Sequence, residues 1–587
     1  MPHANSITVA VVKNNLLSVA REMRETMIRT SPSTIIYEDL DFACGLVDSQ
    51  CGLLAEAPGL TAFMGTLPPA VKKCVSTLGE GSIEDEDVVM ATTPLYTGSH
   101  PPEGMVFTPI FYGNRLFAYA TDKGHLVDFG GKDPYPTDST DPFQEGLRIP
   151  PVKLLKKGEL DSELKQIIMY NSRAPDTVWR EILAQVGAVQ IAKQRVIKLL
   201  DKYGYETAVD CLRQINDFAE KETLNALDKM PKGTWSGEDF CDDDGVVKGK
   251  PIKMKMTFTV TADRLTIDYT GSDDQQKGPM NSPIINTISN SRLMAKLLTA
   301  PFTPAHEGTF RPLEVIAPFG SVFNVDSNVA PTMLYGWPTD ASIELMYKIL
   351  APVFPDRLPA CSGGDLGALM KYGWYTGSKK FWLEASIEGC GQGASRSSDG
   401  GNALIVMSEA CSRNLPCEVE ETRAPVLTER YELQQDSGGP GKFRGGLGIR
   451  RDWRCLGPGN LIAVIEKSFS PHWGVNGGRP GSRNYAIIST SSTQIEKHAV
   501  AKTSEGYEVL KAPSGIVSEG DLISLRLGGG GGWGDPRERE VESVRNDVLQ
   551  GYISVRSARE DYGVVVDSKT MELDADATAK LRASAKN

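Results

Sequence analysis

The first strong hydrophobic pattern lies near the amino terminus, where apolar residues recur at intervals of three and four. Between residues 8 and 29 the positions that follow this spacing are Val9, Val12, Leu16, Val19, Ala20, Met23 and Met27. Because residues three and four apart share one face of an α-helix, the segment is predicted to form an amphipathic helix. The run Thr30-Ser31-Pro32 is expected to end it.

From residue 35 to about residue 150 the pattern changes to short apolar runs separated by turn residues. Residues 44–47, 106–111 and 116–120 are predicted to be strands, and the turn 112–115 joins the last two into a hairpin. This part of the chain is therefore expected to be a hairpin-rich α+β unit.

Two long helical patterns follow. Asp176, directly after Pro175, is the expected N-cap of the first, and Gly204 is expected to end it. The second runs from Thr207 to Met230, and the short connection predicts an antiparallel helical hairpin. The breaker Pro231-Lys232-Gly233 then divides the chain into a predicted α+β domain, residues 1–232, and a second domain, residues 233–587.

The second domain opens with apolar residues at every other position, which is the period of a strand with one buried face. The alternating residues are Ile252, Met254, Met256, Phe258 and Val260, followed by Leu265, Ile267 and Tyr269. Short helices are expected at 340–350 and 408–414, among many strands and glycine-rich turns. The fold class predicted for the whole chain is thus α+β, with a β-rich carboxy-terminal half.

The length of 587 residues allows two to four packed units, and 40% hydrophobic with 24% charged residues is typical of a soluble globular protein. A formal charge of −12 without any basic, aromatic-rich segment argues against nucleic acid as a partner. No apolar run reaches the ~18 residues of a membrane span, and the amino terminus lacks a signal sequence. We therefore expect a cytoplasmic protein with no membrane partner. The ten cysteines contain no C-x-x-C pair and are expected to be reduced.

The usual nucleophile and nucleotide motifs are absent: the sequence has no G-x-S-x-G elbow, no phosphate-binding loop and no H-E-x-x-H helix. The glycine run 528–532 has two interpretations. Its backbone N–H groups are suited to an anion, but no lysine and no helix start follow it, so close backbone packing is the favoured interpretation.

The most informative segment is His100-Pro101-Pro102-Glu103, followed by His125-Leu126-Val127-Asp128. Imidazole and carboxylate are ligands that suit Zn²⁺ or Mn²⁺, and two histidines with one acid leave positions open for catalysis. The hairpin between the two segments is expected to bring His100, Glu103 and His125 together. The alternative is a surface hydrogen-bonding pair in a proline-rich turn.

Two further acidic groups have a structural and a functional interpretation. Glu38 and Asp41 precede the strand at Cys44 and are expected either to face the same cleft or to cap turns. The acidic run between Glu238 and Asp244 is suited to a hard cation, but a solvated turn is the favoured interpretation.

With these segments placed, the sequence resembles the hydantoinase B family, the second large subunit of N-methylhydantoinases, 5-oxoprolinases and ATP-dependent ketone carboxylases. The resemblance spans about residues 8–565. It rests on ordered motifs, namely Tyr37-Glu38-Asp39-Leu40-Asp41-Phe42, Gly98-Ser99-His100, residues 145–151 (EGLRIPP), residues 436–441 (DSGGPG), Phe443-Arg444-Gly445-Gly446, Trp473-Gly474, residues 477–481 (GGRPG) and residues 530–536 (GGGWGDP).

The resemblance implies that ATP and Mg²⁺ are used on a hydantoinase A-type partner subunit with an actin-like fold, in a hetero-oligomer with or without small accessory subunits. It also implies a divalent metal on His100, Glu103 and His125, where many members have Asp in place of Glu103. Asp128 is then expected to orient one of the imidazoles, with Glu38 and Asp41 as further catalytic candidates.

Departures from the family pattern bear on the substrate. Phe63, Thr93 and Leu126 stand where many hydrolytic members carry polar residues, which predicts an apolar cleft. We therefore expect a carboxylase subunit of the acetophenone type, which uses bicarbonate to convert a ketone into a β-keto acid. The alternatives are an ATP-dependent cyclic amide hydrolase (N-methylhydantoinase, oxoprolinase or lactamase) and a non-catalytic scaffold subunit.

Overall fold

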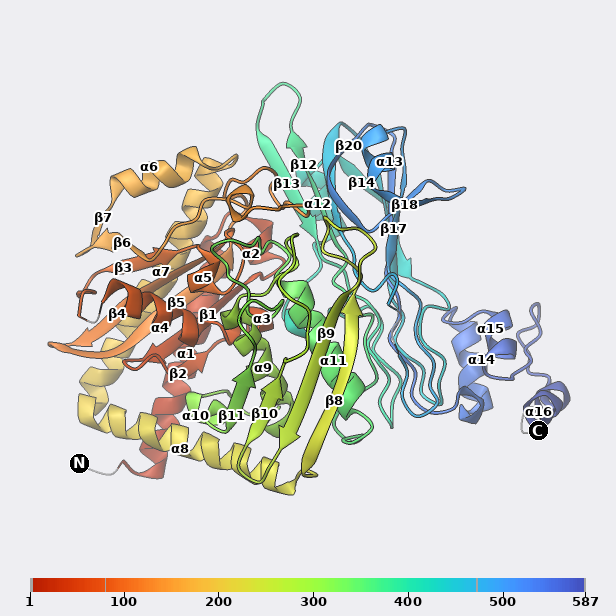
Figure 1. Cartoon of the computed structure of the whole chain (residues 1–587), viewed down its shortest axis with the longest axis horizontal. Helices are drawn as coiled ribbons and strands as arrows, with labels where there is room; N and C mark the ends of the chain where they lie inside the picture. Colours follow the sequence, from red (N-terminus) through yellow and green to blue (C-terminus); the bar gives the residue numbers. More distant parts are fainter. Residues whose placement is uncertain (1–3, 80, 471–472, 585–587) are drawn as a thin grey trace.

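The computed structural model describes residues 4–79, 81–470 and 473–584, in which helices pack around four β-sheets (Figure 1). The predicted α+β class is confirmed. The outermost residues of the two predicted domains, 1–3 and 585–587, lie outside the described part. No helix within the described ranges is long and apolar enough to cross a membrane.

The amino-terminal half is built on one seven-stranded antiparallel sheet. In spatial order its strands are β2 (Leu53–Glu56), β1 (Phe42–Asp48), β5 (Arg115–His125), β4 (Glu103–Tyr112), β3 (Val88–Ala91), β6 (Val152–Lys156) and β7 (Glu159–Leu160). The predicted hairpin is β4–β5, which turns between Tyr112 and Arg115.

Helices pack on this sheet or on one another beside it. They are α1 (Ser6–Thr30), α2 (Thr34–Tyr37), α3 (Thr61–Met64), α4 (Leu67–Leu78), α5 (Pro94–Thr97), the 3₁₀ turn η1 (Pro142–Gln144), α6 (Ser162–Tyr170), α7 (Pro175–Tyr203) and α8 (Tyr205–Lys229). The expected helical hairpin is α7–α8, joined at Gly204 with φ +79°. Asp176 is not the N-cap: α7 already begins at Pro175, whose fixed φ suits the first turn, and Asp176 lies within that turn.

The carboxy-terminal half contains three smaller sheets. In spatial order, the strands of the first are β11 (Leu313–Ile316), β10 (Leu265–Asp268), β9 (Ile252–Val260) and β8 (Gly233–Cys241). Those of the second are β13 (Phe381–Ser386), β12 (Ala368–Trp374), β16 (Gly459–Val464) and β20 (Lys511–Val517). Those of the third are β14 (Val426–Leu433), β15 (Ile449–Cys455), β21 (Leu522–Arg526), β17 (Tyr485–Ser489), β19 (Tyr507–Val509) and β18 (Ala499–Lys502). Along β9 every second residue is buried, as its sequence alternation predicts.

The helices of this half are fewer and mostly short. They are α9 (Ile284–Thr299), α10 (Glu307–Phe310), α11 (Gly336–Leu350), η2 (Met407–Glu409), α12 (Cys417–Arg423), α13 (Thr493–His498), η3 (Pro536–Glu538), α14 (Val541–Leu549), α15 (Val555–Glu560) and α16 (Ala575–Ser584). The prediction of a helix at 408–414 is wrong, since only the short turn η2 forms there. Pro416 follows the segment and disfavours helical geometry at Leu415. The helix α9 was not anticipated.

Glycine-rich segments pack backbone against backbone in the carboxy-terminal half (Figure 1). Neighbouring segments exchange main-chain hydrogen bonds: Gly530 N donates to Gly446 O at 3.0 Å, and Gly531 N donates to Cys361 O at 2.8 Å. A Cβ at Gly445 would clash with the carbonyl oxygen of Gly530. The glycine excess, including the run 528–532, is therefore accounted for by close backbone packing.

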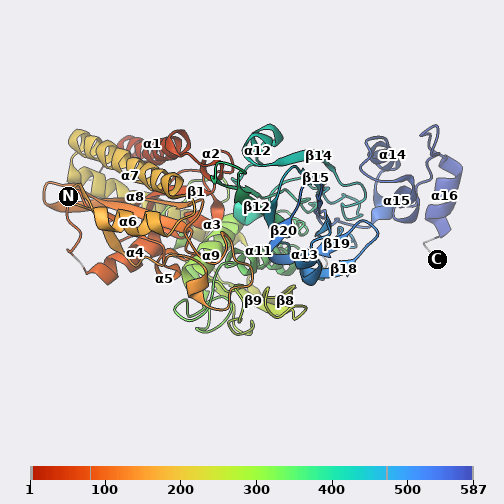
Figure 2. The same cartoon turned by 90° about the horizontal axis from the view of Figure 1, so that it is seen from above.

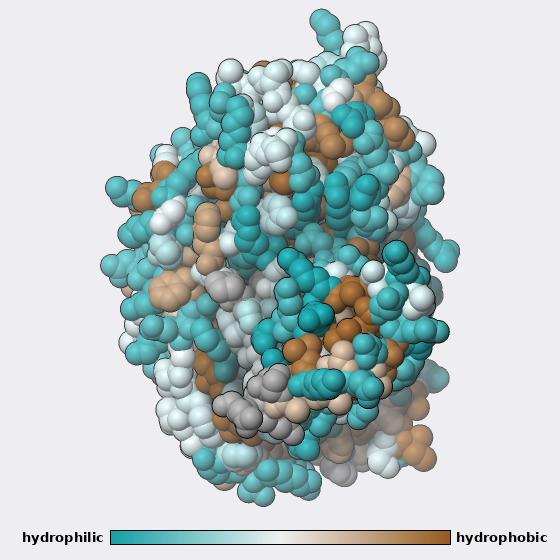
Figure 3. All heavy atoms as spheres, turned by 90° about the vertical axis from the view of Figure 1, so that its right-hand side faces the viewer, coloured by the Kyte–Doolittle hydropathy of each residue, from teal (hydrophilic) through white to brown (hydrophobic). Residues whose placement is uncertain are grey.

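Each half has its own large hydrophobic core, and the second core also takes in Ile35, Tyr135 and Leu227 from the first half. A domain boundary at residues 232/233 stays a prediction. Helices α14–α16 form a separate small cluster at the carboxy-terminal end of the molecule (Figures 1 and 2). Seen from that end, the surface is mostly hydrophilic, with a small gathering of hydrophobic residues (Figure 3).

We expect Gly445→Ala to destabilise the chain by about 1–3 kcal/mol or to prevent folding, because the new methyl group overlaps the main chain at Gly530. The control is Gly187→Ala, at an exposed position of α7 where an added Cβ meets nothing within 4 Å. It should stabilise by about 0.5–1 kcal/mol. Yield and thermal unfolding midpoints measure both effects, and equal midpoints for the two variants would refute the packing argument.

Candidate active site

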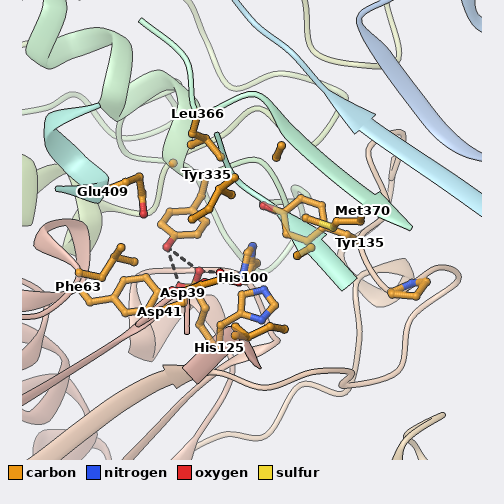
Figure 4. Close-up of a pocket in the computed structure, with 18 of the residues that line it drawn as sticks. Asp39, Asp41, Phe63, His100, His125, Tyr135, Tyr335, Leu366, Met370 and Glu409 are labelled. Carbon is orange, nitrogen blue, oxygen red and sulfur yellow. Dashed lines mark hydrogen bonds and ion pairs between the residues drawn. The ribbon is translucent and has the colours of Figure 1, made fainter. Parts of the chain in front are cut away.

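A cavity of about 90 Å³ lies where the ends of β1, β4 and β5 meet the start of α11 (Figure 4). Its polar and aromatic lining consists of Asp39, Asp41, Phe63, His100, Glu103, His125, Tyr135, Tyr335, Trp337, Asp340 and Glu409. The remaining wall is mostly aliphatic, with Ile35, Leu60, Val127, Leu366, Met370, Leu383 and Ile387 among its residues. Both halves of the chain therefore contribute to this cavity, which we call the site cavity.

Strand register brings the first group of polar residues together. Glu103, the first residue of β4, pairs directly with His125, the last residue of β5. The backbone N–H of His125 donates to the carbonyl of Asp41 at 3.0 Å, which places Asp41 beside it at the start of β1. Gly98, with φ +75°, ends α5 and lets the chain turn toward His100.

The Glu103 carboxylate is the buried centre of this group, with only 3% of the residue exposed. Its Oε1 lies 2.8 Å from His100 Nε2, its Oε2 lies 3.5 Å from Lys123 Nζ, and Tyr335 donates its hydroxyl to Oε2 at 2.6 Å. Burial acts to raise the pKa of Glu103, but the charges of His100 and Lys123 outweigh it and hold the pKa at about 2. Glu103 is thus ionised at neutral pH.

The two imidazoles are held by main-chain carbonyls and by each other. Nδ1 of His100 lies 2.9 Å from Met333 O, Nδ1 of His125 lies 3.1 Å from Leu126 O, and the ring centroids are 5.0 Å apart, edge to face. Burial, together with the nearby His100, lowers the pKa of His125 to about 4, whereas Glu103 raises that of His100 against the effect of burial. At neutral pH His125 is therefore neutral, and His100 forms an ion pair with Glu103.

Glu145, from the EGLRIPP motif, fixes one of these carbonyls. Its carboxylate accepts hydrogen bonds from the backbone N–H groups of Thr332 and Met333, at 2.8 and 2.7 Å. Since Met333 O is the acceptor for His100, Glu145 positions that imidazole through the main chain. The motif thus supports the site without lining the cavity.

Two carboxyl groups of the cavity have an oxygen with no partner. Oδ1 of Asp41 and Oδ1 of Asp340 are buried and lack a hydrogen bond to any described residue. Burial raises the pKa of each to about 8. Such groups are mostly protonated at neutral pH with an ionised fraction, so they are suited to exchanging a proton with a ligand in the cavity.

Two of the predicted catalytic residues lie elsewhere. Asp128 forms an ion pair with Arg173 at 2.6 Å and accepts a hydrogen bond from Ser172, and no imidazole is among its described contacts. The strand ends at His125, so side-chain alternation no longer directs Asp128 to the site face. Glu38 caps the end of α2 and does not line the cavity. The structure brings together His100, Glu103, His125 and Asp41, but neither Asp128 nor Glu38.

The apolar cleft that the sequence predicts is present, but only one of the three residues expected to form it lines the cavity. Phe63 lines the cavity, and its ring lies 4.3 Å from Lys123 Nζ. Leu126 instead packs in the amino-terminal core, and Thr93 does not line the cavity. The apolar character comes mainly from residues of the second half, such as Trp337 and Leu366.

The side chains of the site have donor atoms that suit a metal ion, but their positions in the structure do not suit one. Imidazole and carboxylate are the right donors, and the contacts of both Nδ1 atoms with carbonyls favour Nε2 as the ligating atom. However, no three His, Cys, Asp or Glu side chains in the described ranges are placed so that they could hold an ion. Glu103 is paired with His100, so a metal there has to replace the proton that these two side chains share.

The acidic run 238–244 is not the solvated turn that its sequence suggested. Asp239, Asp242 and Asp244 are buried. Asp239 pairs with Lys467, Asp242 accepts a hydrogen bond from the N–H of Ser468, and Asp244 accepts one from the N–H of Gly278. These carboxylates connect distant segments, which a local sequence pattern does not reveal.

Several residues of the site were missed by sequence reasoning. Lys123 lies on the same strand face as His125, two positions earlier, and this alternation along the predicted strand was a usable signal. Tyr335, Asp340 and Glu409 come from distant segments, and no local pattern connects them to His100.

Known proteins resemble this chain in sequence. A sequence model of the hydantoinase B/oxoprolinase family matches residues 5–536. Caprolactamase subunit beta of Pseudomonas jessenii is 28% identical over 593 residues, with 100% of both chains covered.

Two solved structures are similar over nearly the whole chain. The crystal structure of ATP-dependent caprolactamase from Pseudomonas jessenii has a TM-score of 0.87 at 26% identity, covering 99% of this chain and 100% of that one. A nucleotide-free acetone carboxylase structure has a TM-score of 0.90 at 18% identity, covering 99% and 83%. The second match concerns the fold alone.

We expect Glu103→Gln to destabilise the folded chain by about 3–5 kcal/mol, because it leaves the fully buried Lys123 ammonium without its counter-charge. Glu314→Gln, which breaks the exposed pair with Arg264, is the matched control and should cost less than about 1 kcal/mol. Adding Lys123→Met to Glu103→Gln should recover part of the loss. Equilibrium unfolding in urea measures the series, and equal losses for the two Gln variants would contradict the buried-charge account.

Proposed function

The chain belongs to the hydantoinase B/oxoprolinase family, and we propose that it is a catalytic subunit of an ATP-dependent carboxylase or cyclic amide hydrolase. The resemblance inferred from the sequence motifs is thereby confirmed. The similar proteins are named as a beta subunit and as ATP-dependent enzymes, which supports a partner subunit of the hydantoinase A type as the place where ATP and Mg²⁺ act. Small accessory subunits remain part of the proposal.

For the reaction itself, we propose carboxylation of an aromatic, acetophenone-like ketone by bicarbonate to a β-keto acid. The observation that carries this is the wall of the site cavity, where Phe63, Tyr135, Trp337 and aliphatic side chains surround a charged floor. Such a wall binds a hydrocarbon group and excludes water, which would otherwise protonate an enolate before it attacks the carboxyl donor.

The residues of the floor have separable tasks in this proposal. The buried ammonium of Lys123 supplies positive charge close to the floor, where an oxygen becomes negative, and Tyr335 keeps the Glu103 carboxylate in place. Asp41 exchanges a proton at its unpaired Oδ1. Glu38 and Asp128 are not assigned a role in catalysis.

His100, Glu103 and His125 would hold a divalent metal, Zn²⁺ or Mn²⁺, only if His100 lost its proton and the three side chains moved from their present positions to converge on the ion. When bound, such an ion supplies a Lewis acid for the carbonyl or enolate oxygen. His125 is already neutral at physiological pH, so it needs no deprotonation to serve as a ligand.

Opening of a cyclic amide is the second candidate, and sequence similarity favours it. Among the solved structures, the caprolactamase is 26% identical to this chain and the acetone carboxylase is 18% identical. The same cavity would then hold a lactam ring, and the ionised form of Asp41 would take a proton from water.

Turnover of the complex with its ATP-using partner decides between the two reactions. The measurement is ATP-dependent conversion of a ketone panel and a lactam panel, with ¹³C-bicarbonate supplied throughout. We expect the label to appear in a β-keto acid made from an aromatic ketone. Unlabelled amino acid from lactams alone would establish the hydrolase, and ATP-dependent turnover of neither panel would overturn both.

We also expect His100→Ala and His125→Ala to lose bound metal and turnover together, with activity at least about 100-fold lower. Metal analysis of the purified complex and its turnover after chelation and metal return are the measurements. The matched control is His306→Ala, because His306 is likewise buried but bonds to Leu54 O away from the cavity. Full turnover by a metal-free double variant would leave only a scaffold role for this chain.

A further inference from the structure

A second cavity, of about 360 Å³, lies behind the site cavity and has no part in the function proposed above. It is enclosed by α1, the end of β2, α3, α9 and the segment that leads into α10. Its apolar lining includes Leu17, Leu53, Pro58, Met64, Leu293 and Phe310. The volume falls in the usual range for small-molecule pockets, roughly 300–1,000 Å³.

Only one helical turn separates the two cavities. Phe63 of α3 lines the site cavity, while Thr61 and Met64 of the same helix line the second cavity. Thr61 also donates its hydroxyl to Met407 O at 2.6 Å, which ties α3 to the turn that carries Glu409. The two cavities thus lie back to back across one short wall.

Positive charge predominates in the second cavity. Arg21, Arg292 and Lys296 line it, and Glu56 is the only acidic residue among the lining side chains. Arg292 is paired with Glu307 at 2.8 Å, but Arg21 and Lys296 form no ion pair with a described residue. The Lys296 ammonium donates to Ala300 O and Thr303 Oγ1, two neutral acceptors, and its nearby anionic groups are Glu56 and Glu222, neither of which forms a direct ion pair with it.

Glu56 adds a donor to this set. Its Oε2 is buried and has no hydrogen-bond partner among the described residues. Burial raises the pKa of Glu56 to about 7, although Arg292 and Lys296 act against the rise. In its protonated form the carboxyl needs an acceptor, and the Lys296 ammonium has a third N–H to donate, so one anionic oxygen pair would satisfy both groups.

We propose that the second cavity binds a small carboxylate with a short hydrocarbon chain, with the carboxylate on Lys296, Arg21 and Glu56 and the chain against the apolar wall. The proposal rests on the proposed function in one respect: ketone carboxylation and lactam opening both give a carboxylate product. A site one helical turn from the reaction cavity is then placed to take up that product.

Calorimetry on the full chain tests this with hexanoate and 3-phenylpropanoate as probes and their neutral amides as controls. We expect each carboxylate to bind at least tenfold more tightly than its amide. Lys296→Met should weaken carboxylate binding at least tenfold. Arg21→Gln changes an exposed residue of the lining and should weaken binding about threefold or more. Lys250→Met, at an exposed lysine far from the lining, should have no effect. Equal binding of acid and amide, or of inorganic phosphate and hexanoate, would overturn the assignment.

His125→Ala separates this proposal from the proposed function. It removes a residue of the site cavity only, so hexanoate binding should persist in it. Loss of that binding would place the carboxylate in the site cavity and overturn the inference. If no substrate panel is turned over but Lys296-dependent carboxylate binding remains, the proposed function fails while the second site stands.

Discussion

The ionised carboxylate of Glu103, buried at the end of β4, is the interaction on which the site depends. A carboxylate in this position is tolerated only because His100, Lys123 and Tyr335 surround it. Each of these groups is in turn fixed by something else: His100 by Met333 O, Lys123 by Thr97 O, and Tyr335 by its place at the start of α11. Removing the charge at Glu103 would therefore disturb groups from both halves of the chain.

The carboxy-terminal wall of the cavity depends on a different constraint, the close packing of glycine backbones. The segment from Cys361 joins that packing and continues into Leu366 and Met370, which line the cavity. Asp365 accepts hydrogen bonds from Trp337 Nε1 and from the N–H of Glu466, which anchors the same wall to α11 and to the segment that follows β16. Glycines remote from any reacting group thus hold the apolar surface that the proposed substrate would meet.

Local patterns predicted what local interactions determine. The α7–α8 and β4–β5 hairpins were predicted from the sequence because their periodicity and turns are encoded in neighbouring residues, and the hairpin brings Glu103 and His125 together. Asp128 was expected to orient an imidazole, but the structure pairs it with Arg173, because the strand ends three residues earlier. Tyr335 and Glu409 were not anticipated, since only the packing of one half of the chain on the other brings them to His100. The apolar lining was expected from Phe63, Thr93 and Leu126. Only Phe63 lines the cavity, and Trp337 was not anticipated because it comes from the other half of the chain.

The most direct test of this account is anomalous diffraction from crystals of the active complex soaked in Mn²⁺ or Zn²⁺. The account predicts one strong peak at the floor of the site cavity, within ~2.0–2.2 Å of ligand atoms from His100, Glu103 and His125. It also predicts that the peak and catalytic activity disappear together after chelation. A fully active complex with no anomalous density at these three side chains, or with its metal bound elsewhere, would contradict it.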